Sequence, residues 1–356
     1  MEGIGLRWLM GLISFIHRFG LIELFLVFFV FVNVFAFLLY KMDRGRGVEN
    51  GGRVSEGVLM FFTLGCGGIG ALMGIYLLGH RKWELRLRVF GVIGFVIAMI
   101  PVIHIVHSFT LDRVIRYVEH DFYSEGWPSE LDGYRIGFMT DFHKISDEDM
   151  ADVVRELNGR DLDLLLLGGD FSMIDSHYRG TLREISKAVT GDGIFGVEGN
   201  HDEYVRLFGA MEEYGIVPLC NSGMEVREGF FLAGVQDLWN RNPNIEEAVA
   251  GAGEDDFVLL LSHNPDISMR QGTVGVDFIL SGHTHDGQIT FFGFPIYLLH
   301  DHITDYGTRF AYGFAYSADG TPVFVSSGVG VYYNWPRIFA RPEVVIFTMY
   351  GYGLGE

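Results

Sequence analysis

Five short polar segments in the last two thirds of the chain constrain its fold more than any other feature. Each segment directly follows an apolar run that is typical of a buried strand. Continuous apolar strands separated by helical stretches predict a central sheet covered on both faces, with polar groups beyond the carboxyl ends of the strands. We therefore expect the five segments to converge on one edge. They are Asp141-Phe142-His143, Gly169-Asp170, Gly199-Asn200-His201-Asp202, Ser262-His263-Asn264 and Gly282-His283-Thr284-His285.

The residue types in these segments predict a metal site. Two divalent cations that share a bridging carboxylate need hard oxygen ligands and neutral imidazole nitrogens, with positions left open for water and substrate. A lone histidine at a strand end is more often a structural residue, but a joint cluster of acids and histidines is typical of a functional site. The predicted ligands are Asp141, His143, Asp170, Asn200, His263, His283 and His285.

In order and residue type, the five segments resemble those of the calcineurin-like metallophosphoesterase superfamily, over roughly residues 134–350. The resemblance implies an α/β fold, a layered β-sandwich flanked by helices, and hydrolysis of a phosphoric ester or pyrophosphate. It also implies two metal ions, with His201 as the acid that protonates the leaving oxygen. By the same resemblance, one ion is held by Asp141, His143 and His285, the second by Asn200, His263 and His283, and Asp170 bridges them.

The C-terminal part also resembles a membrane-associated branch of these phosphoesterases, through residues 282–289, residues 326–330 and Arg337. Arg337 is accordingly a candidate substrate contact. Two further candidates, Phe292 and Phe294, lie in a strongly apolar stretch just after the predicted ligands. That stretch fits either a buried sheet edge or an apolar opening that admits acyl chains.

The chain departs from the family pattern at two kinds of position. Many relatives have an aspartate that orients the general acid where this chain has Met173. Two alternatives are open: Asp175 substitutes from two residues further on, or the histidine is held in another way. The membrane-associated branch usually has glycine at Asp286 and often arginine at Ser327. The resemblance therefore specifies the metal ligands more closely than the substrate.

The metals are expected to be held by oxygen and nitrogen alone. The chain has only Cys66 and Cys220, with the first inside an apolar segment, so that neither a disulfide framework nor a thiolate zinc site is available. Manganese, iron and zinc all suit mixed Asp, Asn and His ligands. The family resemblance favours a manganese- or iron-type pair.

Residues 1–110 are much more apolar than the rest of the chain and form a predicted membrane region. Three apolar segments, 21–40, 58–78 and 89–109, are long enough to cross a hydrocarbon layer of about 30 Å. Asn33 is one of two strongly polar residues in the first. Because the first ten residues lack the pattern of a removable signal peptide, we expect an integral protein of the cell membrane.

The charge distribution leaves the side of the catalytic domain open. If all three segments cross, six basic residues lie on each side, and the positive-inside rule decides nothing. A bend at the glycine cluster Gly65-Cys66-Gly67-Gly68-Ile69-Gly70 would instead make the second segment re-entrant. That alternative groups eight basic residues against four and places the enzyme outside.

The rest of the chain is predicted to contain a juxtamembrane linker, 111–133, a catalytic domain, 134–350, and a glycine-rich tail, 351–356. Within the catalytic domain, Ser146 is expected to cap a helix that covers the sheet. A second cluster of polar residues, His300, Asp301, His302 and Asp305, is interpreted as a solvated loop near the mouth of the site.

The net charge of −19, with basic residues gathered around the spans, makes the soluble part strongly acidic. A nucleic-acid partner is therefore not expected. The expected partners are the lipid bilayer and a phosphorylated lipid or small-molecule substrate. Three functions are compatible with the sequence: hydrolysis of a lipid or lipid-linked phosphodiester or pyrophosphate, hydrolysis of a soluble nucleotide, and a non-catalytic membrane sensor or scaffold.

Overall fold

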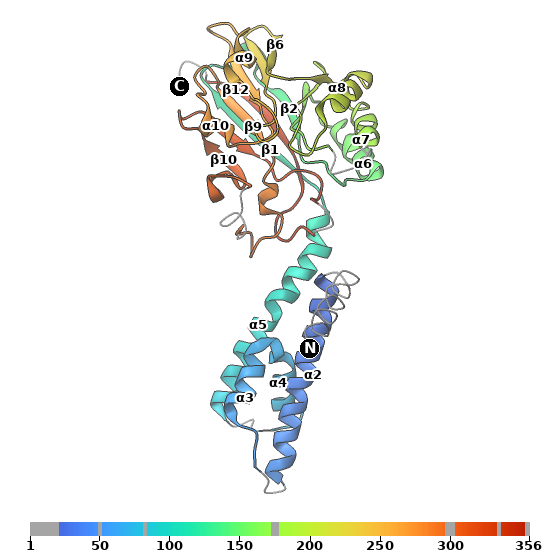
Figure 1. The fold of residues 1–356 in the computed structure, drawn as a ribbon, viewed down its shortest axis with the longest axis vertical. Coiled ribbons are helices and arrows are strands. Elements are labelled where there is room, and N and C mark those ends of the chain that lie inside the picture. The colour runs from blue at the N-terminus through green and yellow to red at the C-terminus, as the bar shows by residue number, and fades with distance from the viewer. Residues whose placement is uncertain are drawn as a thin grey trace, which may run out of the picture. The chain divides into compact units, whose positions relative to one another are not determined.

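The computed structural model describes residues 21–48, 52–80, 84–171, 178–295, 303–332 and 336–352. The chain divides into two compact units, Met1–Val106 and His107–Glu356, and Figure 1 shows their elements.

The first unit is helical. Its elements are α2 (Leu21–Val48), α3 (Glu56–Phe62), a π-helical turn η1 (Thr63–Gly67), α4 (Gly68–Tyr76) and α5 (Leu85–Phe109), which continues into the second unit. Three helical stretches, Phe25–Arg46, Glu56–Tyr76 and Leu85–Arg113, are long and apolar enough to cross a membrane, by length and composition.

The second apolar segment is not one straight helix. The backbone leaves helical dihedral angles at Gly65 and Cys66, between α3 and α4. The glycines nearby allow close packing: a Cβ atom on Gly70 would lie 1.8 Å from the carbonyl oxygen of Asn33, and one on Gly74 would lie 2.4 Å from Cβ of Tyr40.

The second unit contains two six-stranded sheets. The first has the order β1-β12-β2-β3-β4-β5 and the second the order β10-β11-β9-β8-β7-β6. The first sheet is built from β1 (Arg116–Ser124), β2 (Tyr134–Met139), β3 (Leu164–Leu167), β4 (Ile194–Gly196), β5 (Val217–Pro218) and β12 (Glu343–Gly351). The second is built from β6 (Ser222–Arg227), β7 (Phe230–Gly234), β8 (Phe257–Leu261), β9 (Phe278–Ser281), β10 (Gly313–Tyr316) and β11 (Pro322–Val325).

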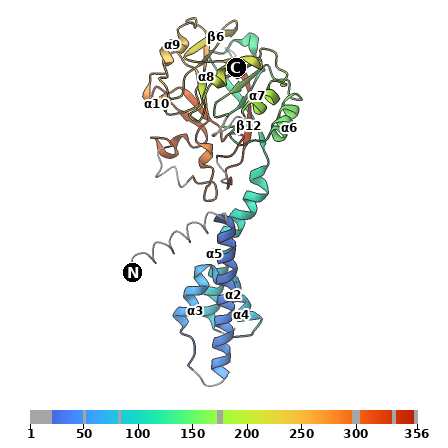
Figure 2. The same ribbon diagram turned by 45° about the vertical axis from the view of Figure 1, so that its right-hand side comes forward.

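The two sheets pack face to face through an aromatic and aliphatic core that includes Phe138, Phe230 and Phe347. Helices cover the outer faces, with α6 (Asp147–Leu157), α7 (Tyr178–Ile185) and α8 (Tyr204–Glu213) on the first sheet and α9 (Ile245–Val249) and α10 (Ile267–Arg270) on the second (Figures 1 and 2). The predicted layered β-sandwich flanked by helices is confirmed.

The predicted sheet-covering helix is also confirmed as α6. The Oγ atom of Ser146 accepts the backbone N–H of Asp149 at 3.0 Å, which caps the helix N-terminus. Met150, Val153 and Leu157 lie buried on the side that faces the first sheet. The Ser146 cap therefore encodes the start of this helix, and the amphipathic pattern encodes which side faces the sheet.

The structure differs from the sequence prediction in the linker. Residues 116–124 form β1, which pairs in parallel with β12 from Arg116↔Glu343 to Ser124↔Gly351. Most side chains of β1 are exposed or only partly buried, so that the segment carries little of the apolar signal of a strand. Gly351, assigned to the tail, ends β12, and residues 353–356 lie outside the described part of the chain.

Candidate metal centre

The ends of strands from both sheets bring the predicted site residues together. Parallel strands β2, β3 and β4 of the first sheet lead to the segments of Asp141, Asp170 and Asn200. Parallel strands β8 and β9 of the second sheet lead to those of His263 and His283. The five apolar runs all form strands, and their polar segments meet at one edge of the sandwich.

One group of donor atoms consists of Asp141, His143 and His285, all buried. The Nε2 atoms of His143 and His285 lie 3.0 Å apart. Nε2 of His285 lies 3.2 Å from Oδ1 of Asp141. Three donor atoms thus point to a common position.

A second group consists of Asn200, His263 and His283. Nδ1 of His283 lies 2.8 Å from Oδ1 of Asn200 and 3.2 Å from Nε2 of His263. The other nitrogen of each ring faces a backbone carbonyl, at 2.9 Å on Ile303 for His283 and at 2.8 Å on Gly168 for His263. A ring N–H donated to those carbonyls leaves a lone pair on each inner nitrogen.

Asp170 lies between the two groups. Its Oδ2 atom is 3.4 Å from Nε2 of His143 and 3.2 Å from Nε2 of His263. Its Oδ1 atom accepts the backbone N–H of His201 at 2.9 Å. One carboxylate therefore reaches both groups and the loop of the predicted acid.

These distances fit metal ions. Ligand atoms about 2.0–2.2 Å from an ion, at tetrahedral or octahedral angles, lie roughly 3 Å from each other. The inner nitrogens of His263 and His283 face one another across 3.2 Å, and a cation between them would be stabilised by their lone pairs once both rings are neutral. The donor set, carboxylate, amide oxygen and imidazole, is one that divalent transition metals accept.

Protonation of the site histidines follows from burial and from Asp170. Burial lowers the pKa of His283 to about 3 and holds the pKa of His285 well below its usual value. Both rings are therefore neutral, which is the form that binds metal. Burial alone would lower the pKa of His263 too, but the Asp170 carboxylate outweighs it and raises that pKa to about 10. A metal ion would thus displace a proton from His263.

The backbone at the predicted ligands is unusual. Asp141, His143, Asp170, His283 and His285 all have φ between +37° and +73°, a left-handed region that non-glycine residues seldom occupy. The loops also pack very closely. A Cβ atom on Gly199 would lie 2.1 Å from Oδ1 of Asp170, and one on Gly282 would lie 2.3 Å from Oδ2 of Asp141. Only glycine fits at these two positions.

Asp202 is a site residue whose role the sequence did not reveal. Its carboxylate accepts three backbone N–H groups, from Asp170 at 2.8 Å and from Phe171 and Gly199 at 2.9 Å. It thereby ties the Asp170 loop to the Asn200 loop. The signal available was its place at the end of the segment Gly199-Asn200-His201-Asp202.

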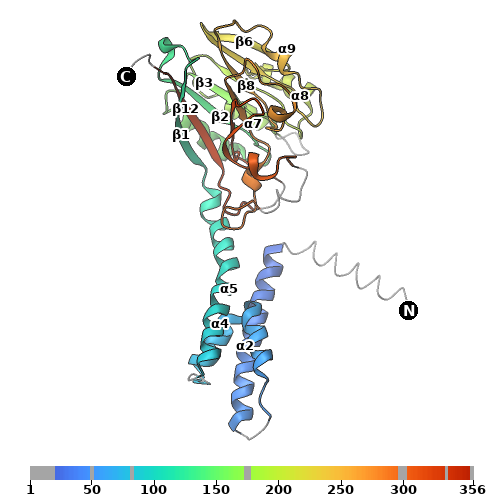
Figure 3. The same cartoon turned by 90° about the vertical axis from the view of Figure 1, so that its left-hand side faces the viewer.

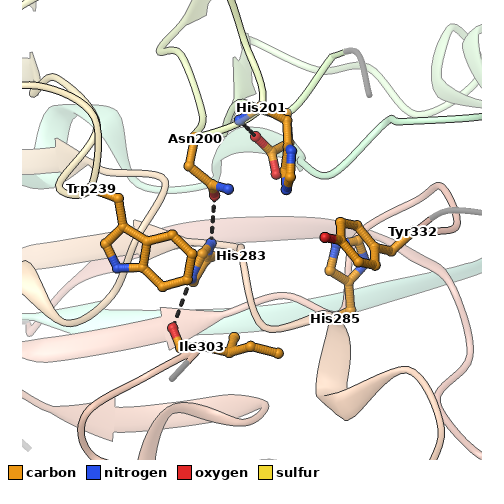
Figure 4. Close-up of a pocket in the computed structure, with 8 residues that line it drawn as sticks. Asn200, His201, Trp239, His283, His285, Ile303 and Tyr332 are labelled. Atoms are coloured by element: carbon orange, nitrogen blue, oxygen red, sulfur yellow. Dashed lines mark hydrogen bonds between the residues drawn. The ribbon is translucent and has the colours of Figure 1, made fainter. Parts of the chain in front are cut away.

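A pocket opens over the donor atoms, and Figure 4 shows its walls. The ring of Trp239 meets the ring of His283 edge-on, with ring centroids 4.5 Å apart. The ring centroids of Tyr332 and His201 lie 5.3 Å apart. Neither aromatic residue is predicted from the sequence. The lining residues are Asp170, Asn200, His201, Trp239, His283, His285, Ile303 and Tyr332.

Arg337, a candidate substrate contact, is not among the described residues that line the pocket. It is buried, at 2% exposure. Its guanidinium donates to the carbonyl oxygens of Gly330 at 2.6 Å, Ser327 at 2.7 Å and Ala340 at 3.1 Å. Nη2 also lies 3.4 Å from Nδ1 of His285. Arg337 thus joins His285 to the loop after β11 and to the segment before β12.

Phe292 and Phe294, the other two candidate substrate contacts, also lie outside that lining. They belong to a tight turn closed by a bridge between Phe291 and Phe294. Phe292 is 49% and Phe294 52% exposed. The alternative of a buried sheet edge is therefore wrong for these residues, because the turn projects their rings out of the core.

Several predicted neighbours of the site lie outside the described residues. Met173 and Asp175 are among them, as are His300, Asp301 and His302. Asp305 is described and forms an exposed ion pair with Arg270, consistent with a solvated loop.

Comparison with known proteins identifies the family. Residues 134–287 match the family described as calcineurin-like phosphoesterase. An Aquifex aeolicus protein named as an uncharacterized metallophosphoesterase is 30% identical over 222 residues, which are 58% of this chain and 80% of that protein. The chain belongs to the calcineurin-like phosphoesterase family. It is thus a metal-dependent phosphoester hydrolase, as the sequence resemblance predicted.

Two further relatives of this phosphoesterase illustrate the range of its similarities. The metallophosphoesterase YkuE of Bacillus subtilis is 29% identical over 257 residues, 67% of this chain and 86% of that protein. A zebrafish protein named transmembrane protein with metallophosphoesterase domain is 27% identical over 244 residues, 62% of this chain. The phosphoesterase spans about half, 54%, of the zebrafish protein. Residues 33–84 match a family of unknown function, DUF1294.

Proposed function

We propose that the chain is a membrane-anchored hydrolase with a dinuclear metal site that cleaves a phosphodiester or pyrophosphate bond of a lipid or lipid-linked substrate. The observation that carries the proposal is the position of Asp170 between two groups of converging donor atoms. One ion would be held by Asp141, His143 and His285, the second by Asn200, His263 and His283, with Asp170 shared. A manganese or iron pair is proposed from the family resemblance.

When bound, such ions supply an acidified water and neutralise the charge of the phosphoryl group. The chain itself must hold the donor atoms in place and deliver a proton to the leaving oxygen. His201 is proposed for that proton, because it lines the pocket and its ring lies 5.5 Å from that of His143. Its backbone N–H bonds to Asp170, so that the acid and the shared carboxylate are fixed relative to each other.

The lipid part of the proposal rests on the aromatic turn, Phe291 to Phe294. Phe292 contacts Phe339, with ring centroids 5.4 Å apart, and Phe339 stacks on His107 at 3.9 Å. His107 lies in the last turn of α5, within the third apolar stretch. Exposed aromatic rings beside the end of a membrane span are suited to the bilayer interface. Such rings would offer apolar contacts to the acyl chains of a lipid substrate.

A soluble nucleotide is the second candidate substrate, and the pocket walls favour it. Trp239 and Tyr332 present aromatic rings beside the donor atoms, and bases stack readily on such rings. In this alternative the membrane unit is only a tether.

The test is hydrolysis by the full chain purified in detergent, first stripped of metal and then supplied with manganese, iron or zinc. A generic aryl phosphodiester reports whether there is any turnover. Lipid phosphodiesters in mixed micelles are then compared with soluble nucleotides. A higher kcat/KM for lipids supports the proposal, whereas a preference for nucleotides supports the alternative. A chain without turnover under all metals would contradict both and favour the sensor or scaffold.

A further inference from the structure

Both ends of the second apolar segment are held by one residue. Oδ1 of Asp43 accepts the backbone N–H of Val54 at 2.8 Å, just before α3. Oδ2 of Asp43 is 2.6 Å from Nε2 of His80, just after α4. A helix that crosses the hydrocarbon layer separates its ends by about 30 Å. This segment instead begins and ends at the same side chain.

The second apolar segment runs along α2 away from Asp43 and then returns along α2 to Asp43. From Val54 at Asp43, the chain reaches Phe62, whose ring lies 4.8 Å from that of Phe35. It then returns along α4 to His80, again at Asp43. Figure 3 shows α4 beside α2, and Figure 2 shows α3 there as well. With 7 and 9 residues, the two helices are only about 10 and 14 Å long, which is half a crossing each.

The turn between the two short helices is stabilised in a way that suits membrane depth. The side chain of Asn33 donates to the carbonyl oxygen of Cys66 at 2.9 Å and accepts the backbone N–H of Gly70 at 3.0 Å. A non-helical backbone within a bilayer needs such partners and must be buried in protein. Gly68 supplies the burial, because a Cβ atom there would lie 2.0 Å from the backbone of Gly94 in α5.

We infer that α3 and α4 form a re-entrant hairpin, so that only α2 and α5 cross the membrane. The chain between the apolar spans 21–40 and 89–109 then carries eight basic residues: Lys41, Arg44, Arg46, Arg53, Arg81, Lys82, Arg86 and Arg88. The segments on the other side carry four, namely Arg7, Arg18, Arg113 and Arg116. Basic residues near the ends of spans stay in the cytoplasm. The catalytic unit therefore lies on the side of the membrane away from the cytoplasm.

This location narrows the substrate class. If the proposed function holds, the substrate is a phosphoester or pyrophosphate displayed at the non-cytoplasmic surface, such as the head group of a lipid in the outer leaflet. The nucleotide alternative would then require an extracytoplasmic nucleotide. The location itself does not depend on the proposed function.

Cysteine labelling of the full chain in sealed, right-side-out vesicles tests the inference. The background carries Cys66→Ser and Cys220→Ser and is checked for hydrolysis in detergent. Single cysteines replace Gly52 before the hairpin, Glu84 after it, and Val274, which is 85% exposed on the catalytic unit. The probe is a maleimide that does not cross membranes, and detergent-opened vesicles serve as the accessibility control.

The expected result is that Val274→Cys reacts in sealed vesicles, whereas Gly52→Cys and Glu84→Cys react only after detergent. Opposite behaviour of Gly52→Cys and Glu84→Cys would show a complete crossing and overturn the hairpin. Reaction of both in sealed vesicles, with Val274→Cys protected, would overturn the orientation. Because labelling requires no turnover, it tests the location of the catalytic unit independently of the proposed reaction. The hydrolysis assays test the reaction.

Discussion

Asp202 accepts the backbone N–H of Asp170 at 2.8 Å, and through this bond the loop after β4 holds the loop after β3. The same carboxylate oxygen accepts the N–H of Gly199 at 2.9 Å. Asp170 in turn accepts the N–H of His201. The loops of the shared candidate ligand and of the candidate acid are thus hydrogen-bonded to each other.

Asp202→Asn tests the importance of this linkage. An amide offers one acceptor oxygen and turns its NH₂ group toward a backbone donor, so that at least one buried N–H loses its partner, at about 1–3 kcal/mol. We expect lower thermal stability and a loss of metal affinity of about 10- to 100-fold, as for other outer-shell partners. Asp152→Asn on α6, where the carboxylate is 63% exposed, is the control. Full metal retention in Asp202→Asn would contradict the prediction.

Asp170→Asn should remove more activity than His143→Ala. Asp170 reaches both groups of donor atoms, whereas His143 belongs to one. We expect losses larger than the roughly 100-fold typical of outer-shell changes, with the greater loss for Asp170→Asn. Metal bound per chain and hydrolysis of an aryl phosphodiester are measured together. Wild-type activity that survives exhaustive chelation would exclude the metal mechanism.

His201→Ala should separate metal binding from proton delivery. Because His201 is proposed as the acid and not as a ligand, the variant should keep its metal. Its rate should fall about 10²- to 10⁴-fold on substrates with poor leaving groups and much less on activated aryl esters. If His201→Ala hydrolysed substrates with poor leaving groups as fast as the wild type does, His201 would be excluded as the acid.

Replacing Phe292 and Phe294 with Ser should raise the apparent KM for a lipid substrate and spare a soluble aryl phosphate. Since both rings are about half exposed, at 49% and 52%, their loss should change the melting temperature little. Val274→Ser, at another exposed apolar position, is the control. Equal loss on both substrates with lower thermal stability would show a structural role instead.

Arg337→Lys should destabilise the catalytic unit. Lysine keeps the charge but cannot serve the several carbonyl oxygens that the guanidinium bonds. With about 1.5–3 kcal/mol for each hydrogen bond to a charged group, we expect Tm to fall by roughly 5 °C or more. Arg206→Lys, at a pair whose arginine is 80% exposed, should leave Tm unchanged. A normal Tm with only KM altered would return Arg337 to a substrate role.

The sequence encodes some of these features locally and others only through tertiary contact. Apolar runs such as Leu164 to Leu167 predict buried strands, and Ser146 predicts a helix start, because each pattern depends on near neighbours. Trp239 and Tyr332 lie in loops, where no periodicity marks a wall of a pocket. The role of Asp202 depends on three N–H groups aligned by folding.

The bend of the second apolar segment illustrates the same limit. The sequence allowed either a straight crossing or a bend at the glycines, since glycine permits both. The choice depends on Asn33 and Asp43, residues of another helix. Likewise, β1 is recognised by its pairing with β12 and not by its own side chains.

The left-handed backbone at the candidate ligands also has an evolutionary consequence. Each such residue costs about 1–2 kcal/mol relative to an ordinary conformation, and glycine would relieve that strain while removing a donor atom. Selection for folding alone therefore acts against Asp141, His143, Asp170, His283 and His285. In a lineage that had abandoned hydrolysis, these positions should drift toward glycine first. Their retention in a relative is thus a sign of continuing catalysis that can be read from its sequence.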